Sequence, residues 1–258
     1  MRRLDLILVD QGKVASRTRA QRLISAGKVK VKAGPHWETP VKAGQKYPDW
    51  VDIDISEDES DRYVSRGGLK LQGALAMSGL SLVGATVIDV GQSTGGFTDC
   101  ALQAGAANVV GIEVGHGQLV EALRDDPRVV CLEGVNARAL PVTLLEYTPA
   151  QQGFDVAVMD VSFISQTRIL PALAPLLKSG GYLLSLVKPQ FEVGPGGLGK
   201  GGIVRDESLY PQVEQTIKTC CQELGLSVRG YFDSPITGGD GNREFFIWAQ
   251  LTAPSSTV

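Results

Sequence analysis

The sequence predicts an α/β protein in which a seven-stranded sheet carries helices on both faces and follows a small α+β domain. From residue 85 onward, apolar runs typical of strands alternate with helical patterns, which indicates a parallel sheet wrapped by helices. The last two strand-like runs lack a long helix between them, so we expect a hairpin at one edge of the sheet. Residues 1–48 carry a net charge of roughly +8, whereas every charged residue of 49–61 is acidic, which sets the first part of the chain apart.

This charge boundary divides the chain into two expected domains. We expect residues 1–61 to form the small domain with an acidic linker at its end, and residues 62–258 to form the α/β domain. The hairpin distinguishes this sheet from the six parallel strands of dinucleotide-binding dehydrogenases. The expected strands cover residues 86–91, 108–114, 129–133, 155–161, 182–188, 226–232 and 244–250.

A basic helix is expected in the small domain. Ser16 is the candidate N-cap, and Ala20, Leu23 and Ile24 recur at helical spacing, which leaves the intervening arginines largely on exposed faces. Clustered cations on one small unit favour phosphate binding over a merely solvated face. The residues that we expect to bind RNA are Arg3, Arg17, Arg19, Arg22, Lys28 and Lys30, with Arg66 from the second domain.

Short strands are expected after this helix. Gly27 ends the helix, and residues 28–31 alternate apolar and charged side chains as a half-buried strand does. A strand meander is then expected through Val41 and Tyr47 to residues 51–55. The first domain is therefore predicted to be a small α+β unit.

The composition argues against several classes of protein. His36 and His116 are the only histidines, so a zinc site or a Ser-His-Asp triad is hard to build, and no metal is expected. No cysteines have C-x-x-C spacing, and Cys100 and Cys131 lie in apolar patterns where we expect buried, reduced thiols. No apolar run approaches the roughly 18 residues that cross a bilayer. Without an expected secretory signal, we expect a cytoplasmic protein.

A glycine-rich turn follows the first strand of the second domain. Residues 86–91 form an apolar strand that contains Asp89, and residues 93–97 then lead into a helix. Glycines at such a turn let the backbone approach a ligand closely. The turn departs from the G-x-G-x-x-G pattern, and the Asp89 carboxylate would repel a pyrophosphate but suits an ammonium group. Since a methionine moiety supplies that group, S-adenosylmethionine is the expected cofactor.

The following strands add further candidates for this site. Glu113 lies about 20 residues beyond the turn, where a carboxylate can hold both hydroxyls of a ribose. Asn136, just after the third strand, is a candidate neighbour of adenine or ribose. The expected cofactor-binding residues are Asp89, Gly91, Ser93, Thr94, Gly95, Gly96, Phe97, Glu113, Val114, Asn136 and Asp160.

A second glycine-rich segment has part of the sequence pattern of a phosphate-binding loop. Residues 194–200 match G-x-x-x-x-G-K, but Gly201 stands where a P-loop needs the Ser or Thr that holds magnesium. We expect this segment to form a mobile lid over the active site, with a simple flexible connection as the alternative.

Charged residues lie at the ends of otherwise apolar strands in the second domain. Asp160 and Lys188 each end a strand, so both are expected at the ligand-binding edge of the sheet. Glu244 opens the final strand, and Lys70 lies near the beginning of a helix. A lysine that ends an apolar strand is costly unless it pairs or takes part in chemistry.

These four residues match the K-D-K-E tetrad of the FtsJ-like RNA ribose 2′-O-methyltransferases. The chain also resembles the TlyA family, also called hemolysin-A-like, in residues 65–71, 89–99 and 187–192. Its basic stretch, residues 16–29, resembles the S4-like RNA-binding domain. The resemblance implies a Rossmann-like methyltransferase sheet and S-adenosylmethionine-dependent 2′-O-methylation of cytidines in ribosomal RNA. It also implies ribosomal RNA or ribosomal subunits as partners, no membrane, and leaves open whether the chain is a monomer or a weak dimer.

Three positions depart from the usual pattern of that family. Gln92 replaces an alanine in the loop and is expected to crowd the cofactor pocket. Glu113 replaces the more frequent Asp and preserves the contact with the ribose hydroxyls. His116 stands where Tyr is common and is expected to alter the edge of the pocket.

The tetrad suits attack by a ribose hydroxyl, which is a poor nucleophile at neutral pH. Transfer requires alignment with the methyl donor and removal of a proton. We hypothesise that Lys188 is the base and that Lys70 orients the 2′-oxygen and disfavours the protonated form of Lys188, while Asp160 and Glu244 position the lysines.

Three other functions are weighed against this one: a non-catalytic RNA-binding ribosome-assembly factor, a membrane-active hemolysin and a nicotinamide-dependent oxidoreductase. The intact tetrad argues against the first. The lack of a spanning segment, a signal or an amphipathic apolar stripe argues against the second. The departure from the dinucleotide-binding pattern argues against the third.

Overall fold

The computed structural model describes residues 1–14, 17–56 and 62–252, and the chain divides into two compact units, residues 1–62 and 63–258. The candidate cap Ser16 and residues 57–61 of the expected linker lie outside the described residues. Among the residues that the structure describes, no helix is long and apolar enough to cross a membrane.

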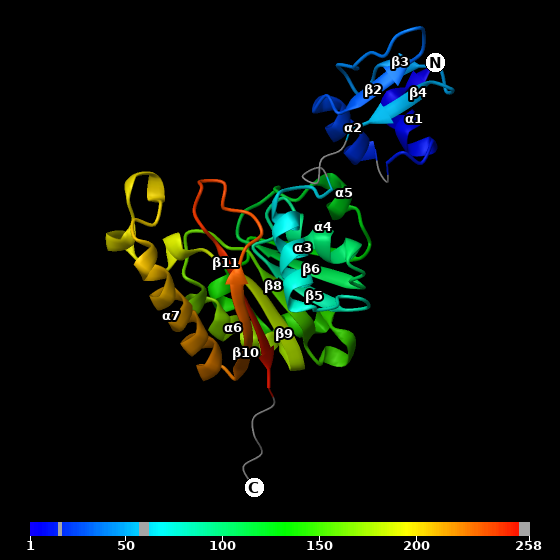
Figure 1. Ribbon diagram of the computed structural model, residues 1–258. Helices are drawn as coiled ribbons and strands as arrows, with labels where there is room; N and C mark the ends of the chain where they lie inside the picture. Colours follow the sequence, from blue (N-terminus) through cyan, green and yellow to red (C-terminus); the bar gives the residue numbers. More distant parts are fainter. Residues whose placement is uncertain (15–16, 57–61, 253–258) are drawn as a thin grey trace. The chain divides into compact units, whose positions relative to one another are not determined.

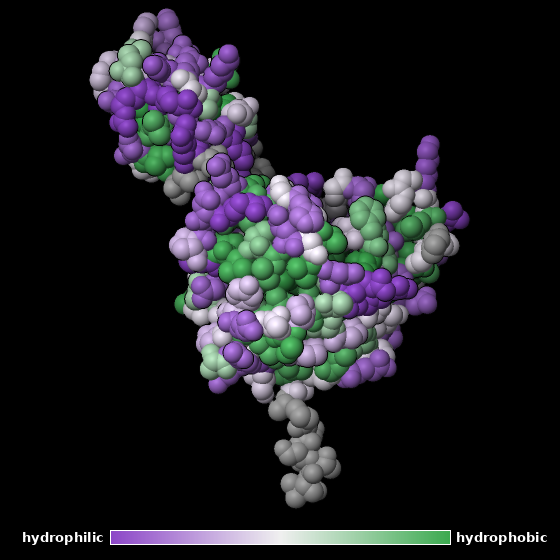
Figure 2. Space-filling view, turned by 180° about the vertical axis from the view of Figure 1, so that it is seen from behind, coloured by the Kyte–Doolittle hydropathy of each residue, from purple (hydrophilic) through white to green (hydrophobic). Residues whose placement is uncertain are grey.

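The first unit packs two helices against two small antiparallel sheets, in which β1 pairs with β3 and β2 with β4 (Figure 1). Hydrophilic residues cover most of the surface of this unit that is visible in Figure 2. Its apolar core takes side chains from both helices and from β2 and β4. The elements are β1 (Arg2–Arg3), α1 (Leu4–Asp10), α2 (Arg17–Ser25), β2 (Val29–Lys32), β3 (Lys46–Tyr47) and β4 (Asp52–Ile55).

The expected basic helix of this unit is present as α2, and the strand expected at 28–31 is β2. The helix α1 was not predicted. The expected meander is wrong at Val41, which lies in a bend with 83% of its surface exposed. Only Lys46–Tyr47 and Asp52–Ile55 of that region form strands.

The second unit is built on a seven-stranded sheet, as predicted. The strands lie in the order β10-β11-β9-β8-β5-β6-β7, and the last two of the chain, β10 and β11, are antiparallel. The strands are β5 (Thr86–Val90), β6 (Asn108–Glu113), β7 (Val129–Glu133), β8 (Phe154–Met159), β9 (Leu177–Val187), β10 (Leu226–Asp233) and β11 (Phe245–Leu251). The helices are α3 (Gly67–Ser78), α4 (Gly96–Gln103), α5 (Glu121–Arg124), α6 (Leu170–Leu173) and α7 (Tyr210–Glu223).

An apolar layer lies on each face of this sheet, which confirms the expectation of helices on both faces. Alternate residues of β5 serve the two layers: Val87 belongs to the layer with α3 and α4, whereas Ile88 belongs to the layer with α6 and α7. Of the two cysteines expected inside, Cys100 is buried and Cys131 half-buried, and both are free thiols. The buried strands therefore form a rigid platform whose edge can present polar groups.

The hairpin of β10 and β11 determines what reaches that edge. Because β11 runs antiparallel to β9, its first residue, Phe245, pairs with Val187, the last residue of β9. The residues that precede β11 therefore lie beside the carboxyl ends of the parallel strands.

The glycine-rich segment 194–202 is a structured turn. Leu198 and Val204 form an antiparallel bridge, and the N–H of Val204 donates to Oδ1 of Asn242 at 3.0 Å. Asn242 Nδ2 in turn donates to the carbonyl of Gly202 at 3.1 Å. No residue of the segment lines either of the two cavities described below, so the structure does not place the segment over them as the expected lid.

Candidate active site

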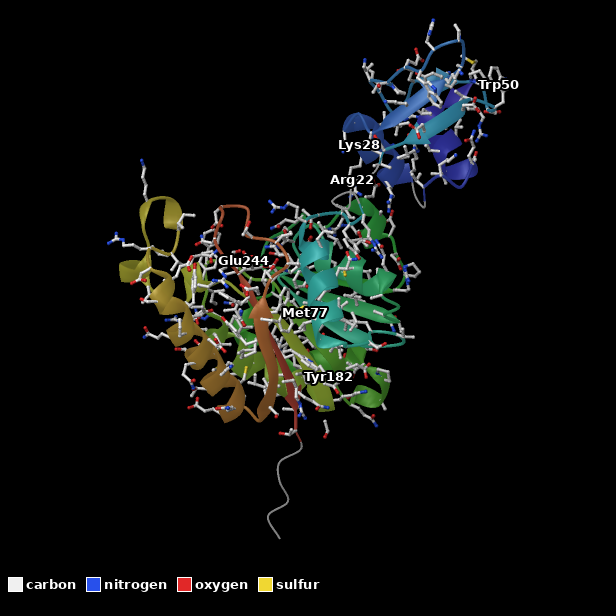
Figure 3. The ribbon with its side chains drawn as sticks, viewed as in Figure 1. Arg22, Lys28, Trp50, Met77, Tyr182 and Glu244 are labelled. Atoms are coloured by element: carbon white, nitrogen blue, oxygen red, sulfur yellow. The ribbon has the colours of Figure 1, made fainter. Side chains whose placement is uncertain are left out.

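The predicted site residues of the second unit gather at the carboxyl edge of the parallel strands. Asp160 follows β8, Lys188 follows β9, and Glu113 is the last residue of β6. Lys70 comes from the first turn of α3, and Glu244 directly precedes β11 (Figure 3). Open α/β sheets bind ligands at this edge, because the loops there are free of the packing that holds the strands.

The four tetrad residues form two ion pairs. Lys70 Nζ lies 2.5 Å from Oε2 of Glu244, and these side chains are only 10% and 2% exposed. Lys188 Nζ lies 2.5 Å from Oδ1 of Asp160, where the exposures are 12% and 22%. Burial raises the pKa of Glu244, and the hydrogen bond from Lys70 opposes that rise. The second pair is more accessible at its carboxylate, whereas the first is nearly sealed from water.

Lys70, Lys188 and Asp160 line a cavity of about 270 Å³. Besides Asp160, five of the predicted cofactor residues line the same cavity: Gly91, Ser93, Thr94, Gly96 and Phe97. Glu244 does not line this cavity and reaches it only through Lys70.

A second cavity of about 480 Å³ adjoins the first, since Gly91, Ser93 and Asp160 line both. Its wall includes Ile112, Val161 and Ile169, and the predicted residues Glu113, Val114 and Asn136 also line it. A mostly apolar cavity with a few polar groups suits a nucleoside. Each carboxylate oxygen of Glu113 accepts a backbone N–H at 2.8 Å, one from Ser93 and one from Gly115.

Asp89 lies beneath the glycine-rich turn and lines neither cavity. It is fully buried, and its Oδ2 accepts a hydrogen bond from Thr98 Oγ1 at 2.6 Å. Its Oδ1 has no hydrogen-bond partner among the described residues. Burial raises the pKa of Asp89 to about 7, and the Thr98 hydroxyl opposes that rise. A buried carboxylate oxygen without a partner is a candidate ligand for an ammonium group.

The glycines of the turn allow close packing against neighbouring chain segments, and Gly91 and Gly96 also line the smaller cavity. Gly91 has φ +84°, and a Cβ there would come 2.3 Å from the carbonyl oxygen of Asp160. A Cβ on Gly96 would come 2.2 Å from Ser65 Oγ. Gly95 lines neither cavity, because its open side faces the side chains of Leu119 and Leu123. Close packing against the protein is therefore a second reason for glycine at these positions, and of the three only Gly95 lines neither cavity.

Gln92 is one of the residues that line the smaller cavity, but most of its side chain lies beneath the loop. Its side chain is 2% exposed and turns under the loop, where Nε2 donates to Thr98 Oγ1 at 2.9 Å. The space comes from Gly111, since a Cβ at that position would lie 1.9 Å from Cδ of Gln92. His116 is exposed and lines neither cavity, so its expected effect on the pocket edge is not seen.

Ser162 is a site residue that the sequence analysis missed. It lines both cavities, and Lys188 Nζ donates to its Oγ at 3.0 Å. The available signal was its place two residues beyond Asp160, in the loop that leaves the strand.

Two of the arginines expected to bind RNA hold a buried carboxylate. Asp5 on α1 is fully buried, and its Oδ2 accepts hydrogen bonds at 2.9 Å from each of Arg3, Arg17 and Gln21. The Arg3 hydrogen bond, above all, holds the pKa of Asp5 well below its usual range. About half of each arginine side chain, 42% and 52%, remains exposed.

The other predicted RNA residues are more varied. Arg19, Arg22 and Lys28 are half-buried, so the expected exposure of the α2 arginines is only partial, whereas Lys30 is exposed and pairs in register with Asp54. Figure 3 shows Arg22 and Lys28 on one side of the first unit and Trp50 on the other. Arg66, in the second unit, is exposed, lines the smaller cavity and donates to the carbonyl of Thr237 at 3.3 Å.

Comparison with known proteins places this geometry in a family. Residues 63–251 match the FtsJ-like methyltransferase family, and residues 2–31 match the S4 domain. The 16S/23S rRNA (cytidine-2′-O)-methyltransferase TlyA of Mycobacterium tuberculosis is 42% identical over 248 residues, which are 95% of this chain and 88% of that relative. The chain belongs to the TlyA family.

Further TlyA-family similarity extends along the chain. Hemolysin A of Brachyspira hyodysenteriae is 38% identical over 245 residues, which cover 94% of this chain and 97% of that protein. A solved structure from Streptococcus thermophilus that carries a hemolysin label is 43% identical. The match covers 97% of this chain and 88% of that one, with a TM-score of 0.70. The family and fold predictions are confirmed, and membership in the TlyA family makes S-adenosylmethionine the cofactor.

Proposed function

We propose that this chain methylates the ribose 2′-hydroxyl of cytidines in ribosomal RNA. The observation that carries the proposal is the presence of two lysine–carboxylate pairs, Lys70–Glu244 and Lys188–Asp160, at the sheet edge that binds ligands. The M. tuberculosis relative is named for this reaction on 16S and 23S RNA, which supports the substrate class.

The residues around the two cavities fit S-adenosylmethionine, which supplies an electrophilic methyl group when bound. Asp89 lies beneath the turn that lines both cavities, and its carboxylate, with Oδ1 unpartnered, would attract the amino group of the methionine moiety toward that turn. Glu113 would hold the ribose hydroxyls, and Val114 and Asn136 would border the base in the larger cavity. Gly91 and Ser93, which line both cavities, would hold the middle of the molecule.

Within the site, Lys188 accepts the proton of the ribose 2′-hydroxyl. Its neighbours Asp160 and Ser162 fix the direction of Nζ. Lys70, held by the buried carboxylate of Glu244, orients the 2′-oxygen. Removing a proton as the bond forms contributes a factor of about 10² to 10⁴ in such reactions.

The first unit would bind the substrate through the phosphate groups. Arg19, Arg22, Lys28 and Lys30 are the proposed contacts there, with Arg66 at the smaller cavity. Arg3 and Arg17 contribute chiefly by holding Asp5 and add phosphate contacts through their exposed parts. The partner is ribosomal RNA within ribosomal subunits, and the proposed compartment is the cytoplasm.

Methyl transfer from tritiated S-adenosylmethionine to rRNA tests the proposal, followed by mapping of 2′-O-methyl sites. Lys188→Ala is expected to reduce kcat at least about 100-fold while binding of S-adenosylhomocysteine and RNA persists. Lys218→Ala is the matched control, because Lys218 forms an ion pair of the same length, 2.5 Å, with Glu214 on α7. Full transfer by Lys188→Ala, or no transfer by the unmodified chain to rRNA or subunits, would contradict the proposal.

A further inference from the structure

Two loops at the carboxyl edge carry one of the ion pairs of the site. The β8 loop, residues 160–168, contains Asp160 and Ser162, and the β9 end, residues 185–192, contains Lys188. The contacts of Lys188 with Asp160 and Ser162 depend on how closely these two segments are held together.

Glu192 binds the β8 loop with both oxygens of its carboxylate. Ser165 Oγ donates to Oε2 at 2.6 Å, and the N–H of Gln166 donates to Oε1 at 2.9 Å. Burial raises the pKa of Glu192, while these two hydrogen bonds oppose the rise. Glu192 is half-buried, and a carboxylate with both oxygens bound by one loop fixes that loop strongly.

Gln166 continues the same connection beneath Glu192. Its side chain is 2% exposed, and its Nε2 donates to the carbonyl of Leu186 at 2.6 Å. Its Oε1 accepts a hydrogen bond from Ser185 Oγ at 2.8 Å. The nitrogen and the oxygen of the Gln166 side-chain amide therefore both bind the last residues of β9, from inside the protein.

An aromatic contact lies on the outer side of the same pair of segments. The rings of Phe163 and Phe191 lie 5.1 Å apart between centroids. Phe163 has φ +64°, an uncommon backbone conformation for a residue with a side chain, and is 91% exposed. A strained residue on an exposed loop persists only where surrounding contacts hold the loop in place.

We propose that Glu192 is a positioning residue that holds the β8 loop against the β9 end and thereby sets the contacts of Lys188 with Asp160 and Ser162. It touches neither cavity and acts only through the loop. This inference rests on the proposed methyl transfer for its kinetic consequence. Its structural consequence, protection of the β8 loop, does not depend on that activity.

Replacement of Glu192 by Ala and by Gln tests the role. We expect Glu192→Ala to lower kcat about 10- to 100-fold, because small misplacements of reacting groups have effects of this size, with KM for rRNA unchanged. Glu192→Gln can still accept from the Gln166 N–H and donate to Ser165 Oγ, so it should remain within about threefold of the unmodified chain. Glu223→Ala, which removes an exposed carboxylate from the end of α7, is the matched control and should have no effect.

A double-mutant cycle with Ser162→Ala separates positioning from general destabilisation. If Glu192 acts by placing the β8 loop, the kcat loss of the Glu192→Ala Ser162→Ala protein is smaller than the product of the two single losses. If the two losses multiply fully, or if Glu192→Ala leaves kcat unchanged, the positioning role is overturned.

Hydrogen exchange gives a readout besides activity. In Glu192→Ala, amides of residues 160–168 should exchange faster, whereas those of β5 and β6 should not change. Unchanged exchange of the loop would overturn the inference even if the unmodified chain proved unable to methylate rRNA. A lack of rRNA methylation with faster loop exchange would count against the proposed function alone. If Glu192→Ala does not fold, Ser165→Ala, which removes one of the two hydrogen bonds, is measured by the same criteria.

Discussion

Asp5 and Asp89 are both fully buried carboxylates, yet their surroundings differ completely. In the first unit, Asp5 accepts hydrogen bonds from two arginines and a glutamine, which lower its pKa. In the second unit, Asp89 has a single side-chain donor, Thr98, and burial raises its pKa to about 7. A buried carboxylate whose oxygens are hydrogen-bonded stabilises a fold. A buried carboxylate that lacks a partner lowers stability, and such a group is retained where a ligand provides the missing interaction.

The two residues therefore have opposite effects on the pH dependence of folding. The pKa of Asp5 is lower in the folded chain, so its contribution is present above about pH 4 and is lost as the pH falls through the lowered value. The pKa of Asp89 is higher in the folded chain, so the folded state takes up a proton near pH 7. The contribution of Asp89 to the free energy of unfolding consequently increases as the pH falls from 7 toward 4.

The largest expected effect is that of Asp89→Asn on cofactor binding. Without the charge, affinity for S-adenosylhomocysteine should fall about 100-fold, which corresponds to roughly 3 kcal/mol, because a charged hydrogen bond is lost. The melting temperature should rise at pH 8, since the unfavourable buried charge is gone. Calorimetric titration and thermal unfolding measure the two changes. If the affinity of Asp89→Asn for S-adenosylhomocysteine is unchanged, Asp89 has no role in cofactor binding that distinguishes it from Asp5.

Asp5→Asn should have the reverse outcome. We expect the first unit to lose about 1 to 2 kcal/mol of stability, because Arg3 and Arg17 lose a charged acceptor while remaining partly solvated. Hydrogen exchange of α1 and β2 measures this loss. The affinity of this variant for S-adenosylhomocysteine should not change. If the amides of α1 and β2 exchange as slowly as in the unmodified chain, the ion pairs of Asp5 contribute little to stability.

The pH dependence of binding should follow Asp89. Affinity for S-adenosylhomocysteine should fall by up to about tenfold per pH unit below pH 7, as the carboxylate takes up a proton, and should be flat between about pH 7.5 and 8.5. Asp89→Asn should abolish this slope. A titration series in matched buffers tests both, and an equally steep slope in the variant would assign the dependence to another group.

The smallest expected effect concerns Gln92, which reaches Asp89 only through Thr98. Gln92→Ala should change affinity for S-adenosylhomocysteine by no more than about twofold, because the side chain is 2% exposed and its amide is bound to Thr98 beneath the loop. Thr98→Val should weaken binding more, since it removes the hydroxyl that favours the charged form of Asp89. The reverse ranking in competition binding would contradict this arrangement.

The strands of the second unit could be predicted well because their burial on both faces makes them continuous apolar runs. The segment 129–133 was predicted with the bounds that the structure gives, and the ends at Asp160 and Lys188 were recognisable because charge interrupts such runs. By contrast, the helix α1 was missed because its seven residues are too few to establish a helical period. The strands β1 and β3, with two residues each, are shorter still and establish no alternation of side chains.

The partners of charged side chains could not be predicted from the sequence. Helical spacing indicates which face carries Arg17, but not that Asp5, twelve residues earlier, is buried against it. The four tetrad residues were recognised together from the sequence. Their division into the pairs Lys70–Glu244 and Lys188–Asp160 depends on the directions of side chains from different loops, which the sequence does not indicate. The position of the Gln92 side chain beneath the loop could not be predicted, because the space for it is provided by Gly111 on the neighbouring strand.

The pairing of Lys70 with Glu244 joins residues that are 174 positions apart in the chain. During synthesis on the ribosome, α3 emerges long before the hairpin that brings Glu244 to it, so Lys70 is exposed to water for most of translation. Lys70 acquires its partner only when β11 inserts between β10 and β9. The proposed methyl transfer would therefore depend on the insertion of this last strand of the sheet.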